Sequence, residues 1–111
     1  MSSIVNKPKN FPEIITLCGS TRFKEEYLDV MKKLTLKGKI VLTVGFWNHA
    51  DNENITIEQK KNVDELHLRK IDLSDSIYVI NVKGYIGQST RNEIDYALKT
   101  GKKIYYHETI K

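Results

Sequence analysis

Short apolar runs and longer stretches of periodic apolar residues alternate along this chain. Four runs rich in β-branched and aromatic residues, at 14–18, 40–44, 77–82 and 103–107, have the length and composition of buried strands. Between them lie three stretches in which apolar residues recur every three or four positions, as on one face of a helix. Strands that alternate with helices in this order predict a parallel sheet with helices on both of its faces.

The periodic stretches also predict where the helices begin and end. Thr56 and Gln59 have the spacing of a capping box, in which each side chain accepts a hydrogen bond from the backbone of the other residue, and they indicate the start of the second helix. Gly38 and Gly101 end the first and third helices, directly before an apolar run. The side chains expected to face the sheet are Phe23, Tyr27, Met31 and Leu34 in the first helix, Val63, Leu66 and Ile71 in the second, and Ile94, Ala97 and Leu98 in the third.

Length and composition indicate a single soluble domain. The chain has 111 residues, of which 40% are hydrophobic and 29% charged, so it is large enough for one core. We assign residues 13–111 to this domain and residues 1–12 to a short basic leader without the apolar core of a secretory signal. Because Cys18 is the only cysteine and cannot form an internal disulfide, a reducing, cytoplasmic location is the simplest interpretation.

Charge and hydropathy narrow the class of partner. The formal net charge is only +4, and the lysines are scattered along the chain, which favours attraction of small anions over binding of nucleic acid. No apolar run approaches the roughly 20 residues of a membrane span. We therefore expect a small-molecule partner and neither nucleic acid nor a membrane.

The segments that follow the strands should converge, because the carboxyl ends of parallel strands meet at one edge of a sheet. These segments are 19–22, 45–47, 81–90 and 107–108, and the long polar connection at 45–55 starts at the same edge. Hydroxyls, glycines, one arginine and aromatic rings gather there, which suits a ligand with an anionic group and a flat ring. The candidate ligand-binding residues are Gly19, Ser20, Thr21, Arg22, Trp47, Asn81, Gly84, Tyr85, Gly87, Ser89 and Thr90.

Two predicted helix starts at this edge have the residues of an anion site. Ser20 and Thr21 offer hydroxyls and amides beside the guanidinium of Arg22, and Ser89 and Thr90 open the third helix in the same manner. The alternative is ordinary helix capping, since Ser and Thr are common N-caps, with Arg22 on the solvated face.

Glu93 has two interpretations that the sequence leaves open. Thr90 and Glu93 have the spacing of a capping box, so the carboxylate would only bond the backbone at the helix start. Alternatively, Glu93 lies in the first turn of the helix, where the helix dipole keeps a carboxylate ionised and available as a nucleophile.

Other polar residues are weaker candidates. Asp72 and Asp75 flank the turn into the third strand and either orient a sugar hydroxyl, protonate a leaving base, or only form the turn. His67 and Lys70 are within reach of the edge, although a half-exposed helix shoulder is the simpler interpretation. We interpret Cys18 as a small core residue.

Motifs for metals and cofactors are missing from the sequence. The three histidines have no ligand-like spacing, no G-x-G-x-x-G precedes an acidic residue at the end of the second strand, and Gly101-Lys102 lacks the rest of a P-loop. We therefore predict neither a metal ion nor an organic cofactor.

Two segments of the chain resemble the nucleoside 2-deoxyribosyltransferase-like superfamily, which includes the 2'-deoxynucleoside 5'-phosphate N-hydrolases. One is LCGSTRF, after the first strand, and the other is SDSIYVINVKGYIGQSTRNEIDYALKTGKKI. The resemblance covers about residues 14–106. It implies a three-layer α/β fold with a flavodoxin-like or Rossmann-like parallel sheet of about four to five strands, and a homodimer, because family members complete their pocket with a residue of a neighbouring subunit.

The resemblance also implies an activity: cleavage of the N-glycosidic bond of 2'-deoxynucleoside 5'-monophosphates through a covalent glycosyl-enzyme. The family's nucleophilic glutamate falls on Glu93, and its phosphate-binding serine and arginine fall on Ser20 and Arg22, with Ser89 at the second helix start. A family aspartate near the third strand has three competing matches, Asp64, Asp72 and Asp75. Assistance to the leaving base would come from Asp72, Asp75 or His67, and stacking on the base from Phe46, Trp47 or Tyr85. The alternatives are a deoxyribosyltransferase that exchanges bases and a non-enzymatic nucleotide-sensing module.

Overall fold

The computed structural model describes residues 7–110 and has the predicted order of elements. Within these residues all strand pairings are parallel, in the order β2-β1-β3-β4. They form an α/β domain with a four-stranded sheet, compatible with a three-layer flavodoxin-like fold. The elements are β1 (Ile14–Cys18), α1 (Lys24–Leu36), β2 (Ile40–Leu42), α2 (Ile57–Asp72), β3 (Ser76–Val79), the 3₁₀ turn η1 (Val82–Gly84), α3 (Gln88–Lys99) and β4 (Lys103–Tyr106).

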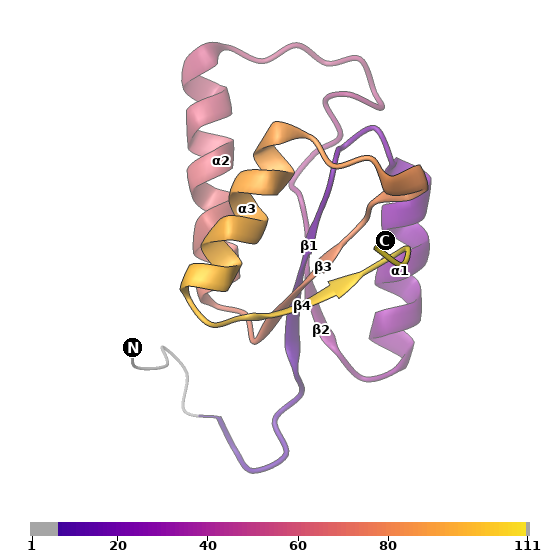
Figure 1. The fold of residues 1–111 in the computed structure, drawn as a ribbon, viewed down its shortest axis with the longest axis vertical. Helices are drawn as coiled ribbons and strands as arrows, with labels where there is room; N and C mark the ends of the chain where they lie inside the picture. Colours follow the sequence, from indigo (N-terminus) through magenta and orange to yellow (C-terminus); the bar gives the residue numbers. More distant parts are fainter. Residues whose placement is uncertain (1–6, 111) are drawn as a thin grey trace.

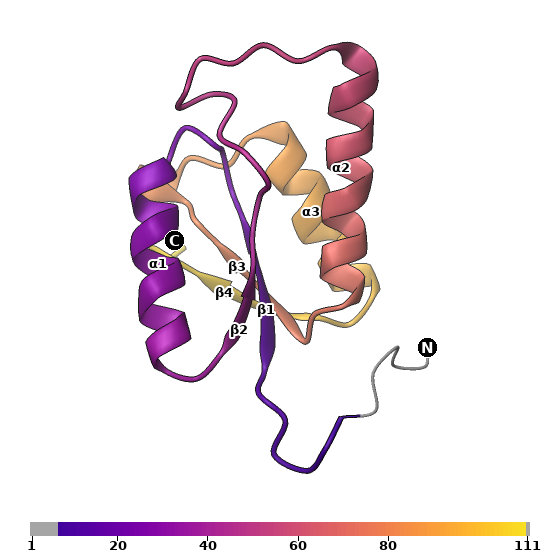
Figure 2. The same ribbon diagram turned by 180° about the vertical axis from the view of Figure 1, so that it is seen from behind.

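Helices cover both faces of the sheet, with α1 on one face and α2 and α3 on the other (Figures 1 and 2). Alternate residues of β1 point to the two helix layers. Ile15 and Leu17 pack with Tyr27 of α1, whereas Cys18 packs with Ile71 of α2 and Ala97 of α3. The last side chain of β1 therefore lies beneath α2 and α3, which decides what surrounds it.

Neighbouring strands β1 and β3 lead into helices on opposite faces, so the chain diverges at their carboxyl ends. In open α/β sheets, ligands usually bind at such a point. Gly19, directly after β1, has a φ of 147°, and a Cβ atom at this position would lie 2.9 Å from the carbonyl oxygen of Ile80. Only a glycine lets the first loop pass this close to the end of β3.

Some element boundaries and inward-facing residues differ from the sequence prediction. The second and third strands are shorter than predicted, because the chain leaves the sheet after Leu42 and turns into η1 soon after Val79. Leu66 and Leu98, expected to face the sheet, are 59% and 62% exposed. Their helices instead bury the neighbouring positions His67 and Ala97, since a helix rotates by about 100° per residue and only one stripe fits against the sheet.

Two further predictions concern the ends of the chain and the membrane. Residues 1–6 of the predicted leader lie outside the described residues. The described part of the leader, residues 7–12, has no helix or strand. Within residues 7–110, no helix combines the length and the apolar character that a bilayer crossing requires.

The capping box at the start of α2 is present and makes a stability prediction. The backbone N–H of Thr56 donates to Gln59 Oε1 at 2.9 Å, and that of Gln59 donates to Thr56 Oγ1 at 3.0 Å. Replacing Thr56 by alanine removes the acceptor for the Gln59 N–H and should lower the free energy of unfolding by about 1 kcal/mol in urea denaturation. The matched control is Thr35→Ala at an exposed position within α1, where alanine should be neutral or stabilising. Equal losses in both variants would contradict the capping role.

Candidate functional site

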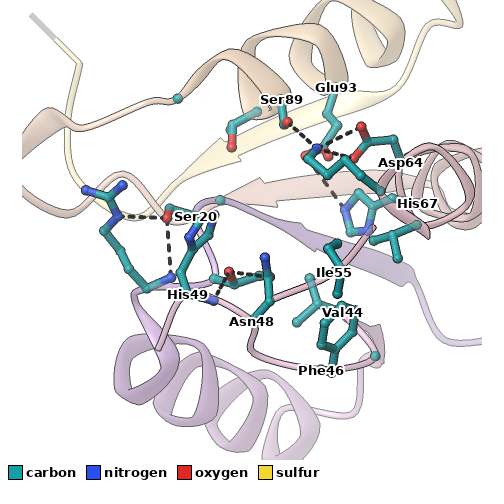
Figure 3. Close-up of a pocket in the computed structure, with 18 of the residues that line it drawn as sticks. Ser20, Val44, Phe46, Asn48, His49, Ile55, Asp64, His67, Ser89 and Glu93 are labelled. Atoms are coloured by element: carbon teal, nitrogen blue, oxygen red, sulfur yellow. Dashed lines mark hydrogen bonds and ion pairs between the residues drawn. The ribbon is translucent and has the colours of Figure 1, made fainter. Parts of the chain in front are cut away.

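A cavity of about 400 Å³ opens at the carboxyl edge of the sheet, on the side of α2 and α3 (Figure 3). Its walls come from the loop after β1, the connection between β2 and α2, the inner face of α2, and the first turns of α3. Segments far apart in the sequence thus meet around one space, as the parallel topology predicts. The predicted residues that line it are Gly19, Ser20, Thr21, Arg22, Tyr85, Gly87, Ser89, Thr90 and Glu93.

Three other predicted binding residues have structural roles outside the cavity. Trp47 packs edge-to-face on Tyr27, with ring centroids 5.0 Å apart, and so belongs to the core beneath α1. The side chain of Asn81 bonds the backbone of Glu108 at 3.1 and 2.8 Å and ties the end of β3 to the end of β4. Gly84 forms the turn after β3 with a φ of 78°. The prediction that these three residues line the ligand site is therefore wrong. Residues 107–108, also expected at this edge, do not line the cavity either.

Asp72 and Asp75 lie at the opposite end of the sheet, where α2 ends and β3 begins. Asp75 Oδ2 accepts a hydrogen bond from the backbone N–H of Ile14 at 2.8 Å, next to the start of β1. Asp72 accepts from the hydroxyl of Tyr96 at 2.6 Å and pairs with Arg69 at 3.0 Å. Both carboxylates hold elements together at the amino edge, so the prediction that one of them acts beside Glu93 is wrong. Asp64, the third match for the family aspartate, lines the cavity.

The predicted capping box at Thr90 and Glu93 does not form. Helix α3 begins earlier than predicted, at Gln88, and its N-cap is Gly87, so Thr90 is already inside the helix and buried. Glu93 lies in the second turn instead of the first, and its side chain is 13% exposed and lines the cavity floor. Helix capping therefore does not explain the carboxylate at position 93.

Three side chains meet beneath the cavity floor. His67 Nε2 lies 3.5 Å from Cys18 Sγ and 3.8 Å from Glu93 Oε1, and the three ligand-type atoms all lie within 4.8 Å of one another (Figure 3 draws the histidine and the glutamate). They come from β1, α2 and α3. His67, predicted to lie on a half-exposed helix shoulder, is buried. A signal was present, because His67 precedes the sheet-facing Ile71 by one helical turn.

Burial sets the protonation of this cluster. It raises the pKa of Glu93 to about 7, with Asp64 raising it further and Lys60 and a hydrogen bond with Cys18 opposing the shift. Burial, together with the charge of Lys70, lowers the pKa of His67 to about 4. Burial also raises the pKa of the Cys18 thiol well above its ordinary value. Near neutral pH the imidazole is uncharged, and Glu93 is the member of the cluster that titrates.

A polar bridge closes one side of the cavity above Glu93. Lys60 Nζ contacts both carboxylate oxygens of Asp64 at 2.8 Å and Ser89 Oγ at 3.1 Å, and so joins α2 to the first turn of α3. Ser89 is therefore an acceptor for a lysine instead of a helix cap. The role of Lys60 cannot be predicted from the sequence, since it depends on the approach of two helices.

The loop after β1 forms the side of the cavity best suited to an anion. Ser20 Oγ accepts hydrogen bonds from Arg22, at 3.0 Å from Nε and 3.3 Å from the backbone N–H. The guanidinium carbon of Arg22 lies 4.6 Å from the ring centroid of Tyr85, which holds the cation at the rim. Thr21 donates to Asn48 Oδ1 at 3.0 Å and fixes this loop to the connection after β2.

An apolar wall stands across from that polar loop. Figure 3 shows Val44, Phe46 and Ile55 grouped together, away from Ser20 and beside the helix that carries His67. Leu66, exposed on α2, belongs to the same lining. A flat apolar group of a ligand would find its contacts here.

Comparison with known proteins adds no family to this description. Neither the protein-family models nor the curated proteins give a match to the chain. What the protein does must therefore be argued from its motifs and from the geometry of the cavity.

Proposed function

We propose that this protein cleaves the N-glycosidic bond of 2'-deoxynucleoside 5'-monophosphates, with Glu93 as the nucleophile. The observation that carries the proposal is the position of the Glu93 carboxylate. It lies on the floor of the cavity, released from any capping role, between a polar loop and an apolar wall. A nucleotide has the same order of parts: an anionic group, a sugar and a flat base.

The parts of such a nucleotide match the three regions of the cavity. The phosphate would lie against the loop after β1, where Ser20 and Arg22 offer hydrogen-bond donors. The base would contact Phe46 and its apolar neighbours. The sugar would then lie above Glu93, and holding both ends of the substrate would bring its anomeric carbon to the carboxylate.

The proposed reaction has two steps, as in retaining glycosidases. An oxygen of the Glu93 carboxylate attacks C1' of the sugar, and the C1'–N bond breaks with its electron pair passing to the base, which takes up a proton. Water then attacks C1' of the glycosyl ester and loses a proton, and the bond to Glu93 breaks. The products are the free base and deoxyribose 5-phosphate, and the carboxylate is regenerated.

Two neighbours support this assignment of Glu93. The imidazole of His67, 3.8 Å from the carboxylate, is uncharged and does not neutralise ionised Glu93, whose negative charge can then stabilise the cationic sugar of the transition state. Asp64, the one of the three competing aspartates that lines the cavity, takes the place of Asp72 and Asp75 as the candidate to hydrogen-bond the leaving base. The homodimer and the cytoplasmic location remain predictions.

The test is an assay of the purified chain against 2'-deoxynucleoside and ribonucleoside 5'-monophosphates, with free base followed by chromatography. We expect base release that requires both the 5'-phosphate and Glu93. Exchange that occurs only when an acceptor base is added would favour the deoxyribosyltransferase instead. Binding of nucleotides without release or exchange would favour the sensing module.

Arg22 should determine the preference for a phosphate. Arg22→Gln removes a charged donor at the polar loop, and we expect kcat/KM for 5'-monophosphates to fall by about 10- to 100-fold, with little change for the unphosphorylated nucleosides. Arg91→Gln is the matched control, because Arg91 is exposed on α3 and does not line the cavity. An equal loss for nucleotides and nucleosides would show that Arg22 does not contact the phosphate.

A further inference from the structure

We propose that Cys18, His67 and Glu93 form a binding site for a zinc ion at the floor of the cavity. The site joins a thiol, an imidazole and a carboxylate, which are the three side-chain types that zinc binds in proteins. The spacing of the histidines along the chain does not predict this site, because each ligand comes from a different element and only one is a histidine.

The distances between the ligand atoms suit a tetrahedral ion. Zinc–ligand bonds of about 2.0 to 2.3 Å place neighbouring ligand atoms of a tetrahedron roughly 3.3 to 3.8 Å apart. His67 Nε2 lies 3.5 Å from Cys18 Sγ and 3.8 Å from Glu93 Oε1, and the longest separation in the cluster is within 4.8 Å. A small rotation of the Glu93 side chain would complete the triangle.

The surroundings hold the ligands and leave one side open. Cys18 is the last residue of β1, fixed by pairing with β3, and His67 is held on the buried face of α2, one helical turn before Ile71. His67 and Glu93 line the cavity, whereas Cys18 lies behind them. An ion bound to the three would therefore face the cavity with its fourth position, which water or a ligand anion can occupy.

Zinc binding and the proposed glycosidic reaction should exclude each other, and this second part of the inference depends on the proposed function. Both need the same carboxylate: zinc takes an oxygen of Glu93 as a ligand, and catalysis needs that oxygen to attack the sugar. Binding also converts the Cys18 thiol to a thiolate and releases its proton to solvent. Zinc should thus act as an inhibitor that nucleotide opposes.

The binding test uses the full, tag-free chain after treatment with a chelator. Cobalt(II) is added as a spectroscopic substitute, followed by zinc. We expect one equivalent of cobalt to give the visible spectrum of a tetrahedral ion together with a thiolate-to-cobalt charge-transfer band, and zinc to displace it. A spectrum of octahedral cobalt, or one without the thiolate band, would overturn the proposal whether or not the protein has enzymatic activity.

Two variants distinguish this site from nonspecific metal binding. Cys18→Ser keeps the size of the side chain and removes the soft ligand, so zinc affinity should fall by at least about 10-fold. His49→Gln changes an exposed histidine that lines the same cavity. Zinc affinity should stay within about 3-fold of the parent, a change in binding free energy less than half of that for a tenfold change in affinity. Equal losses in both variants, or none in either, would contradict the assignment of ligands. The cobalt spectrum of the parent chain reports the thiolate ligand directly, so the proposal can still be tested if a variant fails to fold.

The inhibition test measures base release with and without zinc, relative to the chelator-treated rate of each variant. We expect zinc to inhibit the parent chain, rising nucleotide concentration to relieve the inhibition, and Cys18→Ser to lose the effect. Zinc that binds without changing base release would overturn mutual exclusion and leave the site itself standing. A chain without base release, yet with the cobalt spectrum described above, would contradict the proposed function alone.

Discussion

Replacing Glu93 by glutamine is expected to abolish base release from 2'-deoxynucleoside 5'-monophosphates, with a loss on the order of 10³-fold or more. The amide keeps the size and shape of the side chain but cannot form the glycosyl ester. Nucleotide binding, measured by calorimetry, should persist, because the loop after β1 and the apolar wall are unchanged. Lost release with intact binding and folding would support a catalytic role for the Glu93 carboxylate, and a trapped glycosyl ester on Glu93 in the parent chain would identify it as the nucleophile.

The matched control for this variant is Glu25→Gln, in the first turn of α1, which is exposed and away from the cavity. It should leave base release unchanged. In chelator-containing buffer, release by the parent chain should also rise with pH through about 7, because only the ionised form of Glu93 is a nucleophile and burial raises its pKa to about 7. A Glu93→Gln variant that still releases base at the parental rate would rule out the proposed mechanism.

The second expected result concerns stability: Glu93 and His67 should make opposite contributions to its pH dependence. The pKa of Glu93 is raised from 4.5 to about 7, so the folded chain holds this proton more tightly than the unfolded chain. Its stabilising contribution is complete below pH 4.5 and is lost as pH rises through about 7. The pKa of His67 is lowered from 6.5 to about 4, so its contribution is complete above pH 6.5 and is lost as pH falls through about 4.

The pH ranges over which the two contributions change overlap, and in the parent chain the opposite pH dependences of the two contributions to stability cancel. Between pH 4.5 and 6.5 the folded chain carries its proton on Glu93 and the unfolded chain carries one on the histidine, so these two groups bind the same number of protons in both states. Each single variant should remove this balance. Relative to the parent chain, Glu93→Gln should gain stability as pH rises through this window, and His67→Gln should lose it, by up to about 3 kcal/mol in each case.

The measurement is urea denaturation of the chelator-treated parent chain and both variants from pH 4.5 to 7. The charged and titratable groups around the pair stay in place in both variants: Lys60, Asp64 and Lys70 on α2, and the Cys18 thiol on β1. Opposite slopes for the two differences would confirm that burial controls both groups. Differences that stay flat across this range would contradict the conclusion that burial shifts the pKa values of the two groups.

The sequence determined the order of the elements and the edge at which chemistry gathers. Apolar periodicity and the capping box at Thr56 act through neighbouring residues, and both are present as predicted. The conclusion that Ser20 and Arg22 lie at one edge with Glu93 needed only the rule that the ends of parallel strands converge.

Only the tertiary structure decided which of these residues face a common space. Trp47 and Asp72 belong to other parts of the molecule because the path of a loop and the length of a helix place them there, and neither can be read from spacing along the chain. The start of α3 at Gln88 removed the capping explanation for Glu93. Burial of His67 against Cys18 and Glu93 depends on three elements packing on one face, so the protonation of the cluster and its suitability for a metal ion arise from that packing and not from any local pattern.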